Sequence, residues 1–205
     1  MPKTTSSDYE IVPAGTYPAV LYRILDLGTQ ISEFKGEQKK RYQIRLFWEL
    51  HGEERMVDGR PFAISKTYTY SSHEKSALRR DLEAWRGQKF TEQEIGAFQI
   101  PSLLNIGCLL GISHTENGDK TYTNITSISR MLKGMVAPKA ENPVFCLRLT
   151  NEEFNQEHYD SLTDYFKELI AKSPEYQEIM DIRAGKVDLS NNQNTDEPID
   201  DEIPF

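Results

Sequence analysis

The sequence predicts a mainly β fold with helices, and three features of its 205 residues lead to that expectation. Stretches rich in β-branched and aromatic residues recur between positions 15 and 130. Clusters of Gly, Asn, Asp and Ser separate these stretches, as turns separate strands. One helical pattern interrupts the series. The predicted order is three strands, one helix and two strands.

The second predicted strand, 41–50, has the clearest alternation. Its even positions are Tyr, Ile, Leu, Trp and Leu, and its odd positions are Arg, Gln, Arg, Phe and Glu. Because successive side chains point to opposite faces, one face should be core and the other basic with one aromatic, Phe47. We expect Tyr42 and Trp48 in the core. The first strand should cover 16–25 and end near Gly28, with 30–40 as a polar loop.

The third predicted strand, 60–70, places Lys66, Tyr68 and Tyr70 on one side and hydroxyl residues on the other. The pattern does not decide which side is buried, so both tyrosines could belong either to the core or to a binding face.

A helix follows, with Ser72 as a candidate N-cap and Gly87 as its stop. Arg79 and Arg80 are expected on its exposed face. Its apolar stripe consists of Leu78, Leu82 and Trp85.

The continuous apolar run at 102–112 predicts a buried strand, 116–119 a hairpin turn, and 120–130 a returning strand with a slip near Ile128. Three strands, a helix and two strands within about 115 residues suit a five-stranded Greek-key barrel with a helix between strands 3 and 4, the OB architecture. Other small mixed folds share this order.

The chain after the barrel is expected to be helical and then disordered. A short extra strand is predicted at 143–149, and Thr150 to Glu153 has capping-box spacing. The amphipathic helix that should follow either packs on the barrel or binds a partner or second copy; its stripe is Phe154, Leu162, Tyr165, Phe166 and Leu169. Ser173 and Pro174 should begin a shorter helix through Met180.

These patterns divide the chain into four parts. They are a flexible arm at 1–12, a barrel domain at 13–149, a helical extension at 150–183, and a disordered linker with an acidic tip at 184–205.

The formal net charge of −8 is unevenly distributed. Residues 1–150 carry 20 Lys and Arg against 17 Asp and Glu, whereas residues 151–205 carry 4 against 15. The first segment is therefore net positive by 3 and the second net negative by 11. The first 150 residues can bind a polyanion in spite of the acidic total.

The remaining composition predicts a cytoplasmic protein without a cofactor. No run of eighteen apolar residues exists, and the N-terminal residues lack the apolar segment of a secretion signal. Cys108 and Cys146 lie in apolar surroundings without a CxxC pair, so we expect buried free thiols, no disulfide and no metal.

The last residues read Pro198-Ile199-Asp200-Asp201-Glu202-Ile203-Pro204-Phe205. On a partner, the aromatic residue would fill an apolar pocket while the acids meet Arg or Lys. This segment resembles the acidic tip of bacterial single-stranded DNA-binding proteins, which also follows a disordered polar linker. The resemblance covers six to eight residues, because the preceding 180 do not look like the bacterial protein. With the predicted barrel, the chain looks like a phage-encoded single-stranded DNA-binding protein with a host-type tip.

The resemblance implies that Asp200, Asp201, Glu202, Ile203, Pro204 and Phe205 recruit host replication, recombination and repair proteins. The location would be the bacterial host cytoplasm. Non-specific binding of single-stranded DNA needs cations along the backbone and aromatic rings for base stacking. The candidates are Lys39, Lys40, Arg41, Arg45, Phe47, Lys66, Tyr68, Tyr70, Lys120 and Tyr122. We expect Phe47 to be an exposed stacking ring. Lys35 adds a cation to the loop between the first two strands.

Catalysis is not expected. The sequence lacks GxxxxGK, GxGxxG, HExxH and GxSxG motifs, and its four histidines are dispersed. Two alternative functions remain open. One is an adaptor that binds or sequesters replication proteins without binding DNA, and the other is an annealing or nuclease-accessory factor in recombination.

Overall fold

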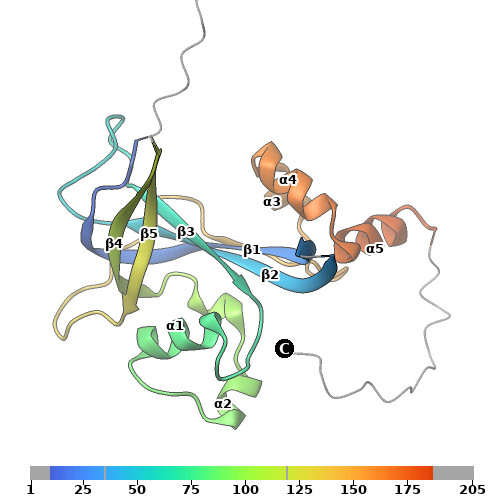
Figure 1. The fold of residues 1–205 in the computed structure, drawn as a ribbon, viewed down its shortest axis with the longest axis horizontal. Helices are drawn as coiled ribbons and strands as arrows, with labels where there is room; N and C mark the ends of the chain where they lie inside the picture. Colours follow the sequence, from blue (N-terminus) through green and yellow to red (C-terminus); the bar gives the residue numbers. More distant parts are fainter. Residues whose placement is uncertain (1–9, 35, 119, 187–205) are drawn as a thin grey trace, which may run out of the picture.

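The fold is known from a computed structural model that describes residues 10–34, 36–118 and 120–186. Its strands are β1 (Gly15–Phe34), β2 (Glu37–Leu50), β3 (Ala63–Thr69), β4 (Gly107–Asn117), β5 (Lys120–Ser129) and β6 (Phe145–Leu147). Its helices are α1 (Ala77–Arg86), α2 (Glu92–Gly96), the 3₁₀ helix η1 (Ile100–Leu103), α3 (Gln156–Asp160), α4 (Asp164–Ala171) and α5 (Pro174–Arg183). Figure 1 shows α1 and α2 below the sheet and α3 to α5 near the far end of β1 and β2.

The strands form one open sheet in the order β3-β2-β1-β4-β5. All neighbours along this path are antiparallel, and the short β6 lies parallel to β1. β3 and β5 are the two ends of the path. The expectation of a mainly β fold with a helix between the third and fourth strands is confirmed for α1, and α2 and η1 were not predicted there. Within the described part of the chain, no helix is long and apolar enough to span a bilayer.

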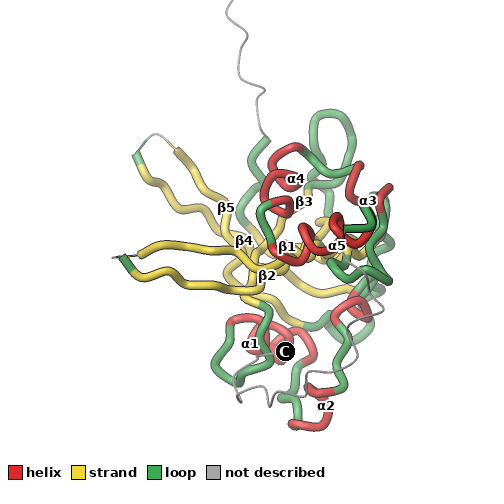
Figure 2. Tube along the Cα trace, turned by 90° about the vertical axis from the view of Figure 1, so that its right-hand side faces the viewer, coloured by secondary structure: helices red, strands yellow, loops and turns green. Residues whose placement is uncertain are grey.

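The first hairpin is longer than predicted. The segment 30–40 was expected to be a loop, but its described residues continue β1 and β2, with pairs from Gln30 opposite Arg41 to Phe34 opposite Glu37. These parts of the strands could not be predicted from the sequence, because exposed hairpin arms lack the alternation of apolar and polar residues that indicates a strand. In Figure 2 this hairpin and the β4–β5 hairpin extend to the same side of the molecule.

The main core lies between the sheet and α1. The even positions from 42 to 50 of β2 are buried or half-buried as predicted, and Trp48 packs against Trp85 of α1 with ring centroids 6.0 Å apart. Tyr68 is also buried here, which settles the face of β3. Helix α1 begins later than expected: its N-cap is Ser76, not Ser72, while Gly87 ends it in the left-handed conformation as predicted.

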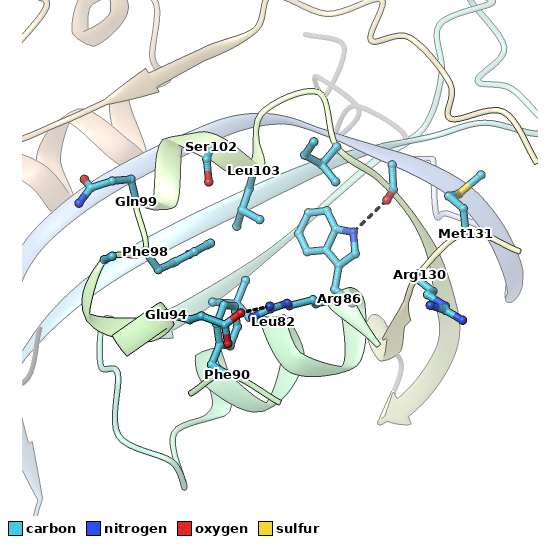
Figure 3. A pocket seen from close by; sticks show the side chains of 14 residues that line it. Leu82, Arg86, Phe90, Glu94, Phe98, Gln99, Ser102, Leu103, Arg130 and Met131 are labelled. Atoms are coloured by element: carbon cyan, nitrogen blue, oxygen red, sulfur yellow. Dashed lines mark hydrogen bonds and ion pairs between the residues drawn. The ribbon is translucent and has the colours of Figure 1, made fainter. Parts of the chain in front are cut away.

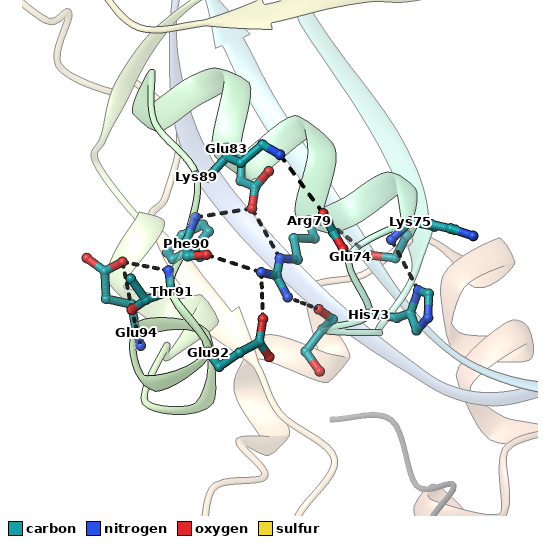
Figure 4. Close-up of polar contacts among 12 residues, drawn as sticks. His73, Glu74, Lys75, Arg79, Glu83, Lys89, Phe90, Thr91, Glu92 and Glu94 are labelled. Carbon is teal, nitrogen blue, oxygen red and sulfur yellow. Dashed lines mark hydrogen bonds and ion pairs between the residues drawn. The ribbon is translucent and has the colours of Figure 1, made fainter.

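Arg79 was expected to be exposed, but it is buried and organises the chain around α1 (Figure 4). Its guanidinium donates to Glu83, Glu92 and the carbonyl oxygens of Ser72 and Phe90 at 3.0 to 3.2 Å. Three of these acceptors, Ser72, Phe90 and Glu92, lie outside α1, and only the fold brings them to Arg79.

A second core covers the other side of β1 and β2. The single amphipathic helix predicted after Thr150 is instead two short helices, α3 and α4, and Tyr165 of the expected stripe is exposed. Helix α5 begins at Pro174 after Ser173, as predicted. The buried residues of this core include Tyr22, Phe47, Leu147, Leu162 and Ile179. Here the extension packs on the sheet.

Two irregularities in β1 let this second core form. The pairing with β2 skips Tyr22 and Leu27, and both bulged side chains enter the second core. Next to the second bulge, Gly28 has a φ of +68°, and a Cβ there would lie 2.5 Å from the Ser173 side chain. Thr29 then donates to the Glu175 carboxylate from its backbone nitrogen at 2.8 Å.

The second half of the sheet follows the prediction more closely. The apolar run at 102–112 is split, because η1 and a turn with Asn105 at a φ of 64° precede β4. The turn at Gly118 is as expected, and β5 carries a bulge where its pairing with β4 shifts.

Cys108 and Cys146 are free thiols, and burial raises the pKa of each to about 12. In the predicted flexible arm, Val12 is a buried core residue, and residues 1–9 lie outside the described part.

Candidate nucleic-acid interface

The face of β2 that turns away from the main core carries cations beside hydroxyl groups of β3. The odd positions Arg41 and Arg45 lie on this face. The Nε of Arg45 donates to Ser65 Oγ at 2.9 Å, and its Nη1 donates to Thr67 Oγ1 at 3.4 Å. The guanidinium is thus positioned by the neighbouring strand, which lowers the entropy it would lose on binding a phosphate.

The β4–β5 hairpin forms a second wall of this surface. A cavity of about 430 Å³ lies between it and the β2–β3 face, with Arg45 and Ser65 on one side and Tyr122 on the other. The Tyr122 side chain is 49% exposed. An exposed aromatic ring beside a cation is the pair of groups that single-stranded nucleic acid needs.

A second hollow of about 520 Å³ continues along the same strands. Arg41 and Thr67 line it, together with His73 and the exposed Lys75 from the segment before α1. Arg41 and Arg45 are four residues apart, or about 14 Å along a strand. We call the surface formed by Arg41, Arg45, Ser65, Thr67, Lys75 and Tyr122 the outer groove.

Aromatic rings and a second arginine support the floor of the outer groove. The Arg45 guanidinium lies over Phe47 and Phe166, with 5.7 and 5.3 Å to their ring centroids. The Arg23 guanidinium lies 5.2 Å from the Tyr22 ring centroid and 5.5 Å from that of Phe47. Its Nε is buried without a hydrogen-bond partner within the described residues. Burial raises the pKa of Tyr22, so its hydroxyl stays protonated at neutral pH.

The prediction that Phe47 is an exposed stacking ring is wrong. Its side chain is 8% exposed and packs edge to face with Tyr22 and Phe166. The alternation of β2 placed Phe47 correctly on the face opposite the main core. It could not show that the helices after residue 155 cover this end of the face.

Three other candidates lie on the opposite face of β3. Lys66 Nζ is 2.6 Å from the Asp81 carboxylate, and the buried Tyr68 donates to the same group at 2.8 Å. Burial and the nearby Asp81 charge raise the pKa of Tyr68. Tyr70 packs beside Tyr42, with ring centroids 6.0 Å apart. None of the three lines the cavity of Arg45, although the buried Tyr68 also borders the hollow that contains Arg41. The prediction of one combined groove required all three to lie with Arg45.

The remaining candidates fall into three places. Arg45 and Tyr122 line one cavity of the outer groove, Arg41 lines the other, and Lys120 is exposed at the start of β5. Lys39 and Lys40 are exposed on the arm of β2 that leads to the hairpin turn, and Lys35 lies outside the described residues. The tip residues lie outside them too: Asp200, Asp201, Glu202, Ile203, Pro204 and Phe205.

Sequence reasoning missed Tyr22, Ser65 and Lys75 as neighbours of this surface. Ser65 and Lys75 are not part of any recognisable motif. The bulge at Tyr22 interrupts the alternation of β1 that would have predicted which face this side chain occupies. The partner of Arg45 could have been found only from the register of β2 with β3.

One cluster outside the groove, of which only Glu49 is buried, has the composition of a metal site. Ligand atoms of Glu49, His51 and Glu141 lie within 4.8 Å of one another. The Glu49 carboxylate already accepts hydrogen bonds from His51, from the backbone nitrogens of Glu141 and Asn142, and from the Asn142 side chain, at 2.5 to 2.9 Å. Glu141 also pairs with Arg55 at 2.6 Å. This network ties the segment before β6 to β2, and a metal ion would have to displace it.

No protein-family model and no curated protein matches this chain.

Proposed function

We propose that this chain is a single-stranded DNA-binding protein with an OB architecture that binds DNA through the outer groove. The observation that carries the proposal is that Arg45 and the exposed Tyr122 line one cavity, while Arg41 lines a second hollow farther along β2. Cations along one strand face suit successive phosphates, and a tyrosine ring offers a stacking surface for any base. Neither group reads base edges, so binding would be independent of sequence.

The strand arrangement supports the OB architecture. The order β3-β2-β1-β4-β5, with helices between β3 and β4, fits a five-stranded Greek-key barrel opened between its third and fifth strands. OB folds bind oligonucleotides on strands 2 and 3, between the loop after strand 1 and the loop after strand 4. The outer groove occupies the corresponding surface: β2, β3 and the β4–β5 hairpin.

We also propose that the tip at 200–205 recruits host replication, recombination and repair proteins. Its sequence supports this part: three acids precede Ile203-Pro204-Phe205, and a proline limits the entropy lost on docking. The protein would then have two separate contacts, the outer groove for DNA and the tip for proteins. A bacterial host and a phage origin remain part of the proposal.

Fluorescence anisotropy with labelled oligo-dT and a matched duplex, over a salt series, tests DNA binding. We expect binding to the single strand, weaker binding to the duplex, and a slope of log K against log salt of about −2 to −3 for three or four phosphate contacts. Absence of single-strand binding at low salt would contradict the proposal and favour the adaptor function.

The division of roles has its own test. A chain without residues 198–205 should bind oligo-dT at least as tightly as the full chain and should fail to capture host replication and repair proteins. Weaker DNA binding by the shortened chain would contradict the proposed separation.

A further inference from the structure

One cavity lies away from the outer groove, between α1, α2 and η1 (Figure 3). Its volume is about 910 Å³, and its walls are largely apolar, with Leu82, Phe90, Phe98, Leu103 and Met131. Phe90 and Phe98 pack edge to face with centroids 5.4 Å apart. We call this cavity the α1–α2 pocket.

The polar groups at the α1–α2 pocket favour an acidic ligand. Trp85 also lines the pocket, but its Nε1 already donates to the Gly107 carbonyl at 2.9 Å. Arg86 pairs with Glu94 and lies over the Phe90 ring, 4.6 Å from its centroid. Arg130 is exposed at the pocket, and in the described chain no acidic side chain pairs with it. One cation is therefore available to a carboxylate.

The apolar surface continues beyond the α1–α2 pocket. Ile106 lines the pocket and is 46% exposed, and Leu132, shortly after Met131, is 64% exposed. Neighbouring exposed apolar side chains mark interaction surfaces in soluble proteins. The ligand should therefore combine an apolar end with acidic groups.

The chain itself contains such a segment. Ile203-Pro204-Phe205 is apolar, and Asp200-Asp201-Glu202 precedes it directly. The 16 residues 187–202 that precede Ile203 can span about 55 Å when extended. A domain of the size described has a diameter of about 40 Å. The connection is long enough to reach the pocket.

We propose that Ile203-Pro204-Phe205 docks into the α1–α2 pocket of its own chain, with the preceding acids near Arg130. Burial of the phenylalanine ring supplies the main attraction, and the carboxylates supply orientation. Arg130 follows β5, whereas Tyr122 lies near its start, about 27 Å away along a strand. Docking therefore leaves the outer groove open. It withholds the tip from other proteins until a competitor displaces it, which adds a regulatory step to the proposed recruitment.

A labelled synthetic peptide of residues 196–205 tests this docking by fluorescence anisotropy. It should bind the chain that ends at residue 197. It should bind the full chain at least about tenfold more weakly, because a tethered copy at millimolar effective concentration competes for the pocket. A peptide with Phe205→Ala should bind the shortened chain at least about tenfold more weakly than the unchanged peptide.

Matched variants of the shortened chain locate the binding site. Arg130→Glu and Ile106→Asp should each weaken peptide binding severalfold. Arg80→Glu, on the exposed side of α1, and Ile31→Asp, on the exposed β1–β2 hairpin, make the same changes outside the pocket and should not. All four positions are exposed, and circular dichroism checks that each variant is folded.

Three outcomes would overturn the proposal. The peptide could fail to bind the shortened chain, or it could bind the shortened and full chains equally. The full chain could also show weaker peptide binding only at concentrations where it dimerises, which would assign the pocket to the tip of a second copy. None of these readouts involves DNA, so failure here is distinguishable from failure of the proposed DNA binding.

Discussion

Arg45 donates from its Nε to Ser65 Oγ at 2.9 Å, across the pairing of β2 with β3. This bond fixes a cation above the outer face of the sheet, beside the cavity that Tyr122 closes on its other side. Arg45 and Ser65 are 20 residues apart in the chain, and their hydrogen bond joins β2 to β3. It defines the centre of the outer groove and decides which substitutions test it.

Tyr122→Ala should weaken binding of oligo-dT by about 5- to 150-fold, because one base loses a stacking contact of about 1–3 kcal/mol. Tyr165→Ala is the matched control, since Tyr165 is an exposed tyrosine on α4 outside the groove. Anisotropy titrations at one salt concentration measure both variants. Equal affinities for the two would remove Tyr122 from the interface.

Arg41→Ala should reduce the steepness of the salt dependence by about 0.7, the contribution of one phosphate contact on a single strand. Lys66→Ala should leave the slope unchanged, because Lys66 lies on the other face of β3 and pairs with Asp81. The comparison needs oligo-dT titrations at four or more salt concentrations. If Lys66→Ala changed the slope of the salt dependence and Arg41→Ala did not, the DNA-binding face would be the one that carries Lys66.

Phe47→Ala should lower the free energy of unfolding by about 3–5 kcal/mol, because it removes a buried ring between Tyr22 and Phe166. Urea unfolding followed by circular dichroism measures this loss. Phe47→Leu keeps most of the volume and should be affected much less. A folded Phe47→Ala variant with unchanged stability and much weaker DNA binding would restore Phe47 as a stacking ring.

Glu94 links α2 to α1 and should make the region around the α1–α2 pocket sensitive to acid. The Arg86 hydrogen bond, with that of the Thr91 backbone, lowers the pKa of Glu94 from 4.5 to about 2. A carboxyl group with a lowered folded pKa stabilises the fold above its unfolded pKa, and this contribution is lost as the pH falls toward 2.

Glu94→Gln removes that contribution. The midpoint of thermal unfolding should therefore fall less between pH 6 and pH 3 in this variant than in the unchanged chain. Arg86→Gln, which removes the partner of Glu94, should reduce the pH dependence in the same way. The same fall in all three proteins would show that the Arg86 pair does not contribute to stability.

Local sequence patterns were sufficient where the cause of the structure is local. The alternation of β2 assigned the main-core residues Ile44, Leu46 and Trp48, because a strand with one face in the core must alternate. Gly87 and Ser173 ended and began helices as expected, since capping depends on neighbouring backbone groups. The outer-groove cations Arg41 and Arg45 came from the same alternation.

The sequence by itself determined the succession of the five main strands along the chain, the polarity of β2 from residue 41 and the separation of a basic body from an acidic end. Only the tertiary structure decided that Phe47 and Arg79 are buried, that Tyr68 faces the main core, and that Tyr122 stands across from Arg45. The physical reason is that exposure depends on which distant segment covers a face. Helices more than 100 residues away cover Phe47, and the bulges of β1 create the surface on which they pack.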